Sequence, residues 1–274
     1  MMWLELAFIQ RALIACILSG LLTGLIGVFV ARMRLSAIGY SMSHGAFAGA
    51  ALGVAISMNP LFTALLFSAA TALLIGPVAD KARMPVDLVT SIAFPLNMAL
   101  AFIFLTLSPQ VGLSSEVASV LWGSVVSMTN EDLLCLTILF TATLASIQLF
   151  WKELFAIMFD RKMAEADGIN TKPFLYFIIF LVGLVITFAL KLVGGILIFA
   201  LLFNPASSAL QFLHDMRKII IVSPILGALS CLSGLILSIF LDLPVGSCIV
   251  LVSTLIFAIS VLFSPKRRRK EVKP

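Results

Sequence analysis

Long apolar runs separated by short polar segments dominate the chain. The runs are rich in Leu, Ile, Phe, Ala and Gly and lack the period-two alternation of membrane β-strands. A helix that crosses the hydrocarbon core needs about 20 such residues, and every backbone group in lipid must be paired internally. The pattern therefore predicts an all-α, polytopic helical membrane protein with eight to nine transmembrane helices. The nine expected crossings are residues 12–31, 42–57, 61–79, 89–107, 132–150, 174–190, 194–211, 219–241 and 246–263.

The composition indicates the same class. Hydrophobic residues make up 61% of the 274 residues, charged residues only 11%, and the mean hydropathy is +1.17. A soluble domain of this length cannot bury so much apolar surface, so lipid must surround most of it. The first apolar run is followed by Arg32 and Arg34 rather than by a small-residue cleavage site. We therefore expect a retained span and not a signal peptide.

Basic residues gather on one side of the expected spans, which predicts the orientation. The segment 108–132, on the other side, has no Lys or Arg. Because basic loops stay in the cytoplasm, the N-terminus is expected outside and the C-terminus inside. The basic residues are Arg32, Arg34, Lys81, Arg83, Lys152, Arg161, Lys162, Lys172, Arg217, Lys218 and the tail Lys266 to Lys270.

Two segments leave the number of crossings open. Residues 1–11 are amphipathic and could lie along the outer interface. Residues 119–128 are apolar but too short to cross, and they could form a half-helix against the bundle.

A polar island, Trp151 to Pro173, lies between two of the spans. Charged residues are scarce in this chain, yet they are dense here, and the charged stretch closes with Gly168. A membrane protein gains little from a short charged helix on one side unless something docks there. The island is therefore a candidate contact for a soluble partner.

The usual motifs of catalysis are missing from the sequence. It has no GxxxxGK[ST], HExxH or GxSxG pattern, and no carboxylate pair within a span. We therefore expect no enzyme activity and no ATPase site, so energy must come from an ion gradient or another subunit. The four cysteines occur singly in apolar runs, which argues against a disulfide framework or a structural zinc site.

Polar residues at membrane depth are candidates for lining a pathway, because each is costly there unless paired or functional. The candidates are Tyr40, Ser43, Asn97 and Asn204, together with His44 as a metal ligand. A neutral imidazole is a common ligand of transition metals. A histidine without a second strong ligand can equally serve packing or hydrogen bonding. The small residues from Gly45 to Gly53 predict a central span, and either close packing or a role in lining the pathway would explain them.

Several stretches, in order along nearly the whole chain, resemble the permease subunits of bacterial ATP-binding-cassette importers for zinc, manganese and iron. Each motif alone is weak, but the ordered set is specific. The matching stretches are Phe8 to Ala12 with GLLTGLIGVFV at 20–30, Ser43 to Gly53, Leu121-Trp122-Gly123-Ser124, Phe159-Asp160 through Ala166-Asp167-Gly168, Val193 to Ala206 and Asp242-Leu243-Pro244-Val245-Gly246.

The resemblance implies a type II importer fold and a set of partners. It implies a single transmembrane permease domain over 1–265, with a coupling segment at 159–170 and a basic cytoplasmic tail at 266–274. A second permease copy, a cytoplasmic ATP-binding subunit and an extracytoplasmic substrate-binding protein would complete the transporter in the bacterial inner membrane. No cofactor of its own and no nucleic acid are expected. The residues implied to contact the ATPase are Asp160, Arg161, Met163, Ala164, Glu165 and Gly168.

One position departs from the family. Its members usually read G-D-x-x-S-H, with an acidic residue one helical turn before the histidine, where this chain has Tyr40. The hard carboxylate is thus replaced by a phenol, which is neutral near pH 7. A transient contact with His44, a different metal or a chelated substrate all remain open.

Two other functions are weighed against an ATP-driven metal importer. A gradient-driven secondary transporter would use ionisable residues near the midplane or broken inverted repeats. We find no Asp, Glu or Lys well inside a span, and no evident inverted repeat. A membrane scaffold without transport activity would tolerate replacement of His44 and of 160–168.

Overall fold

A computed structural model describes residues 7–35, 37–107, 123, 128–195 and 198–265. All regular elements in these ranges are helices, which confirms the predicted all-α class. The helices are α1 (Ala7–Arg32), α2 (Ile38–Ala55), α3 (Pro60–Ala82), α4 (Val86–Leu107), α6 (Asn130–Leu149), α7 (Trp151–Phe159), α8 (Arg161–Ala166), α9 (Thr171–Val193), α10 (Ile198–Phe212), α11 (Met216–Leu241) and α12 (Val245–Leu262).

Each of the nine expected crossings coincides with a helix, but two helices differ from the rest. Within the described residues, seven are long and apolar enough to cross a membrane: α1, α3, α4, α6, α9, α11 and α12. The helix α2 has 18 residues, but glycine, serine and His44 lower its hydropathy. The helix α10 has 15 residues and is roughly 22 Å long at 1.5 Å per residue, shorter than the hydrocarbon core.

A glycine ends α9 before α10. Gly194 ends α9 with φ +94°, in a region of backbone space that favours glycine, and α10 begins only at Ile198. The helix α9 thus runs past the expected end of the span 174–190, up to the glycine that begins the expected span 194–211.

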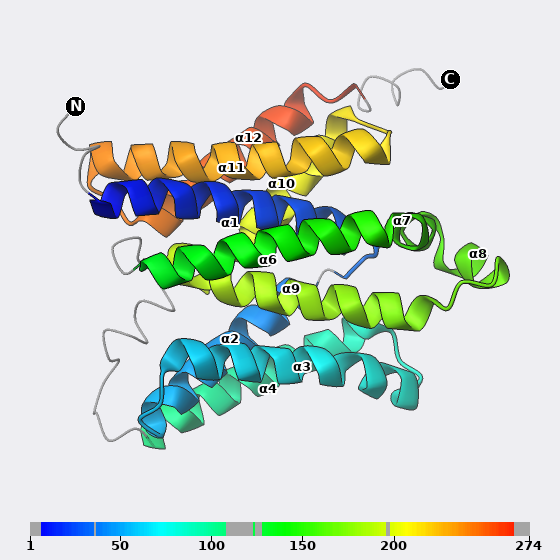
Figure 1. The fold of residues 1–274 in the computed structure, drawn as a ribbon, viewed down its shortest axis with the longest axis horizontal. Helices are drawn as coiled ribbons and strands as arrows, with labels where there is room; N and C mark the ends of the chain where they lie inside the picture. The colour runs from blue at the N-terminus through cyan, green and yellow to red at the C-terminus, as the bar shows by residue number, and fades with distance from the viewer. Residues whose placement is uncertain (1–6, 36, 108–122, 124–127, 196–197, 266–274) are drawn as a thin grey trace.

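The helices form two groups joined by α9 (Figure 1). One group holds α1, α10, α11 and α12, and the other holds α2, α3 and α4. The helix α9 contacts members of both groups, and most of its side chains are buried. The helix α6 lies beside α1 and α9 (Figure 1).

Backbones approach very closely between α1 and α11. A Cβ atom on Gly20 would lie 2.5 Å from the carbonyl oxygen of Gly227, so only glycine fits there. One turn along, the Ser223 hydroxyl donates to the Gly24 carbonyl oxygen over 2.6 Å. These contacts join α1 and α11 along their middle turns.

The helices α7 and α8 lie beyond one end of the bundle (Figure 1), which we call the elbow end. Residues 7–11, weighed as a separate interfacial segment, instead belong to the continuous helix α1. The expected half-helix at 119–128 and the basic tail at 266–274 lie largely or wholly outside the described residues.

Candidate functional site

The polar island folds into two short helices at right of the bundle in Figure 1, followed by the start of α9. The helix α7 buries Leu154, Ile157 and Met158 against the bundle, while its last residue, Phe159, is 71% exposed. One face of α7 thus anchors the segment, and its end projects. We call Trp151 to Thr171 the elbow.

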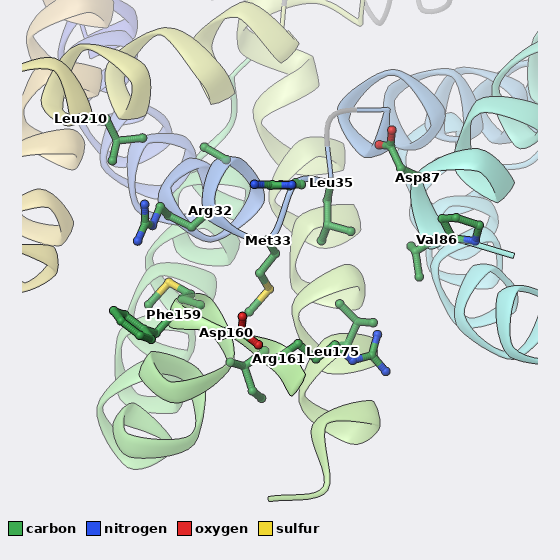
Figure 2. A pocket seen from close by; sticks show the side chains of 15 residues that line it. Arg32, Met33, Leu35, Val86, Asp87, Phe159, Asp160, Arg161, Leu175 and Leu210 are labelled. Carbon is green, nitrogen blue, oxygen red and sulfur yellow. The ribbon is translucent and has the colours of Figure 1, made fainter. Parts of the chain in front are cut away.

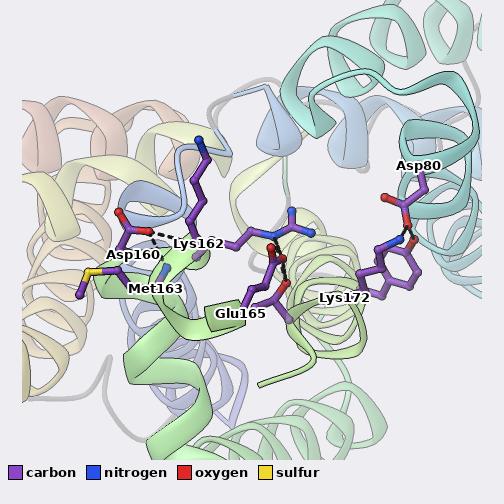
Figure 3. Close-up of polar contacts among 9 residues, drawn as sticks. Asp80, Asp160, Lys162, Met163, Glu165 and Lys172 are labelled. Carbon is purple, nitrogen blue, oxygen red and sulfur yellow. Dashed lines mark hydrogen bonds and ion pairs between the residues drawn. The ribbon is translucent and has the colours of Figure 1, made fainter. Parts of the chain in front are cut away.

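Asp160 makes the turn between the two short helices. Its backbone is extended, which ends α7, and its carboxylate caps α8 (Figure 3). The Oδ1 atom accepts hydrogen bonds from the backbone N–H of Lys162 over 2.8 Å and of Met163 over 3.1 Å. The positive N-terminal end of the helix dipole also stabilises a carboxylate at this position.

Glu165 fixes the other end of α8 to α9. Its Oε1 accepts from the Nε atom of Arg161 over 3.0 Å and from the hydroxyl of Thr171 (Figure 3). These donors, Thr171 first and Arg161 second, hold the pKa of Glu165 below its ordinary value. Thr171 is the first residue of α9, so this contact ties the elbow to a central helix.

The chain leaves α8 through Gly168, whose φ of +85° strongly favours glycine. The N–H of Ile169 donates to the Ala164 carbonyl oxygen over 2.9 Å and closes the turn. Ala164 is buried beneath the elbow, whereas Met163 is 59% exposed. The structure therefore brings together all six residues implied to contact an ATPase.

A cavity of about 660 Å³ opens beside the elbow (Figure 2). The charged residues in its lining come from three places in the chain: Arg32 at the end of α1 with Arg34 just after it, Asp87 at the start of α4, and Asp160 with Arg161. In the sequence, Arg32 and Arg34 indicate only that the first span is retained and which of its ends faces the cytoplasm. Their convergence with the elbow depends on the fold, and no local pattern indicates it.

The second group of candidates lies on α2. The carbonyl oxygen of Tyr40 accepts from the Ser43 hydroxyl over 3.1 Å and contacts Nδ1 of His44 at 2.9 Å. Tyr40 is 39% exposed and His44 is half-buried. The helical spacing thus places the three predicted side chains in one cluster.

Two phenylalanines from other helices complete this cluster. The ring of Phe199, in the first turn of α10, lies 4.2 Å from the ring of Tyr40 between centroids. The ring of Phe94 in α4 meets His44 edge-on at 4.6 Å. Sequence reasoning missed both, because phenylalanine is common throughout the chain.

Asn97 and Asn204 have different surroundings. The Nδ2 atom of Asn97 donates to the carbonyl oxygen of Ser41 over 3.0 Å and thereby joins α4 to α2. The Nδ2 atom of Asn204 lies 3.0 Å from the hydroxyls of both Ser253 and Thr254 on α12. The role of either residue in a pathway stays a prediction.

The described residues hold no group of three or more His, Cys, Asp or Glu side chains that could bind a metal ion together. A permanent metal site is therefore not supported among these residues, and the role of His44 as a metal ligand stays a prediction.

Comparisons with known proteins agree with this architecture. The model of the ABC 3 transport family matches residues 5–264. The manganese transport system membrane protein MntC of Listeria monocytogenes is 34% identical over 264 residues, covering 96% of this chain and 93% of that protein. The manganese import system permease protein ScaB of Streptococcus parasanguinis is 30% identical, with coverage of 96% and 93%.

A solved structure has the same fold. A chain of PsaBC from Streptococcus pneumoniae in complex with Fab superimposes with a TM-score of 0.86 at 27% identity. The match covers 98% of this chain and 96% of the other.

Proposed function

Because the chain belongs to the ABC 3 transport family, we propose that it is the permease subunit of an ATP-binding-cassette importer that moves a transition-metal ion or its chelate inward. The names of MntC and ScaB favour manganese within this class. A gradient-driven secondary transporter is not favoured by the family match. ATP would act only through a partner subunit.

The elbow is the proposed docking site of a cytoplasmic ATP-binding subunit. The observation that carries this proposal is the exposure of Phe159 and Met163, two large apolar side chains on a charged segment beyond the membrane spans. Exposed apolar residues rimmed by charges are typical of interaction sites. Asp160 and Glu165 hold the segment in one shape, so docking would not have to order it.

The remaining assembly follows from the proposed docking side. The elbow end would face the cytoplasm and the opposite end would receive a substrate-binding protein. The N-terminus would then lie outside and the C-terminus inside the bacterial inner membrane. A second permease copy would complete a path near the dimer axis, and ATP-driven closure of the partner would rock the bundles between outward-open and inward-open states.

The cluster on α2 is the proposed point of contact with the cargo. The neutral phenol of Tyr40 offers one uncharged oxygen where a carboxylate would offer two oxygens and a negative charge, so the pair with His44 is a weaker site for a cation. A weak site suits transport, because an ion must leave as readily as it enters.

The docking proposal is tested with Met163→Asp in the chain co-expressed with the ATP-binding subunit of its transporter. A charge placed among apolar contacts loses favourable burial and adds desolvation cost, so co-purification of the two subunits should fall about tenfold. Uptake of radioactive manganese by cells should fall in parallel.

A matched control is Met58→Asp, at the other end of the bundle, because Met58 is also exposed, at 46%. It should leave association with the ATP-binding subunit unchanged. Equal loss from both variants, or normal association of the Met163 variant, would contradict docking at the elbow.

A further inference from the structure

The first turns of α9 are held from two directions. On one side the Thr171 hydroxyl donates to Glu165 of the elbow. On the other, the next residue, Lys172, forms an ion pair with Asp80 of α3, with 3.0 Å between Nζ and Oδ2 (Figure 3). The helix α9 therefore stands between the elbow and α3.

Asp80 has a second partner on α9. The hydroxyl of Tyr176 donates to the same Oδ2 atom over 2.6 Å. Lys172 and Tyr176 are four residues apart, so they project from one face of α9 toward α3. Two donors from one helix thus converge on one carboxylate of another.

The position of Asp80 at the end of α3 indicates that this residue serves the contact with α9. It lies in the last turn, where the negative end of the helix dipole disfavours a carboxylate. A residue selected for the stability of α3 alone would be neutral or basic there. The contacts with Lys172 and Tyr176 offset this unfavourable interaction with the dipole. The contact between α3 and α9 therefore explains why a carboxylate stands at this position.

Packing supports the same pairing independently of charge. A Cβ atom on Gly76, one turn before Asp80, would lie 2.2 Å from the ring of Tyr176. Further along, the Ser68 hydroxyl donates to the Gly183 carbonyl oxygen over 3.3 Å. The two helices are therefore in contact along much of their length.

From α3 the contact continues to the cluster on α2. A Cβ atom on Gly49 of α2 would lie 2.5 Å from the carbonyl oxygen of Thr63, so the backbones of α2 and α3 touch. The helix α2 carries Tyr40 and His44. A continuous set of contacts thus runs from the elbow through α9 and α3 to the proposed cargo site.

We propose that Asp80 is a positioning residue that transmits movement of the elbow to α3 through Lys172 and Tyr176. This inference rests on the proposed function, since it requires an ATP-binding subunit to move the elbow. Loss of the contact would loosen α9 from α3 at the elbow end, where Asp80 lies, while the packing further along remains. ATP would then be hydrolysed with less cargo carried per cycle.

The experiment uses the complete transporter in proteoliposomes, with manganese uptake and ATP hydrolysis measured in the same vesicles. Asp80→Asn removes the charge, and Tyr176→Phe removes a single oxygen and keeps the ring against Gly76. Each variant should lower the ions carried per ATP by about three- to tenfold. Hydrolysis and association with the ATP-binding subunit should be retained.

Two further variants separate this role from a general loss of charge. Lys81→Ala removes an exposed lysine beside Asp80 and should leave the ratio unchanged. Asp80→Lys and Lys172→Asp, each made alone, should also lower the number of ions carried per ATP. The double variant that swaps the two charges should recover part of that loss.

The outcomes are distinct. An unchanged ratio in both Asp80→Asn and Tyr176→Phe overturns the inference and leaves the proposed function intact. Loss of the ATP-binding subunit from these variants also overturns it, because Asp80 would then act in docking. Failure of the unaltered chain to associate with any ATP-binding subunit refutes the proposed function itself.

Discussion

Nδ1 of His44 lies 2.9 Å from the carbonyl oxygen of Tyr40, one turn earlier in α2. Because a carbonyl oxygen can only accept a hydrogen bond, the neutral ring carries its proton on Nδ1. The lone pair is then on Nε2, the atom available to a metal ion. The helix backbone thus sets the tautomer, and the edge contact with Phe94 helps to fix the ring.

Replacement of the imidazole tests its contact with the cargo. His44→Ala should lower manganese or zinc uptake about tenfold or more, because the described residues hold no group of three or more His, Cys, Asp or Glu side chains that could replace it. Metal content of cells by mass spectrometry measures the effect. The control is His214→Ala, which removes the other histidine at an exposed position between α10 and α11. Normal accumulation in the His44 variant would exclude the contact.

A carboxylate at position 40 should alter ion selectivity. Tyr40→Asp places a hard oxygen ligand one turn before His44, so uptake of manganese should rise relative to zinc, by about threefold or more. Competition between the two ions in an uptake assay measures the ratio. Tyr40→Phe keeps the ring that lies against Phe199 but adds no hard oxygen ligand, so it should not raise manganese uptake relative to zinc. A constant ratio in the Asp variant would show that cargo does not meet this residue.

The elbow should keep its structure over a wide pH range. The lowered pKa of Glu165 means that its contacts with Thr171 and Arg161 are fully present above the ordinary value of 4.5 and are lost only as the pH falls through the lower, folded-state value. Hydrogen exchange of the amides around Ile169, corrected for intrinsic rates, should be constant from about pH 8 to about pH 5.

The variant Glu165→Gln provides the comparison. It removes the titrating group and should weaken protection equally at every pH. Protection that declines between pH 8 and pH 6 in the unaltered chain would contradict the assignment, since no titration of Glu165 falls there.

The contact between α1 and α11 predicts a strong effect of one methyl group. Gly20→Ala would place Cβ at 2.5 Å from the Gly227 carbonyl oxygen, so the helices must separate, at a cost of about 1–3 kcal/mol. Thermal unfolding in detergent should show a lower midpoint.

The neighbouring change Ser19→Ala is the control for that variant. The Ser19 hydroxyl is buried and has no hydrogen-bond partner among the described residues, so its removal should be neutral or stabilising. If Gly20→Ala left the midpoint unchanged, the close approach of the two backbones would be wrong.

Much of the fold follows from the sequence, because the hydrocarbon core imposes length and apolarity on each span. The elbow was also predictable, since its charges stand out in a chain with few of them, and Asp160 and Gly168 are typical of a helix start and a helix end. The end of α9 was not, because the helix runs past Lys191 to Val193 before Gly194 ends it.

The cluster around Tyr40 and His44 was predictable only for the residues that lie on α2 itself. Spacing along α2 groups Tyr40, Ser43 and His44, but their neighbours Phe94 and Phe199 come from helices far apart in the chain. Asp80 was overlooked for the same reason. It looks like an ordinary charge at a span end, and its meaning comes from Lys172 and Tyr176 on another helix.

Helices whose backbones touch cannot slide or rotate past each other without first parting. The pair formed by α1 and α11 meets this condition at Gly20 and Gly227, with the Ser223 hydroxyl as an added fastening. These two helices should therefore keep the same position relative to each other throughout the transport cycle. Cross-linking them should then be tolerated, and the rearrangements that release cargo should be sought on the opposite flank, where α2 and α3, whose backbones also touch, would move together.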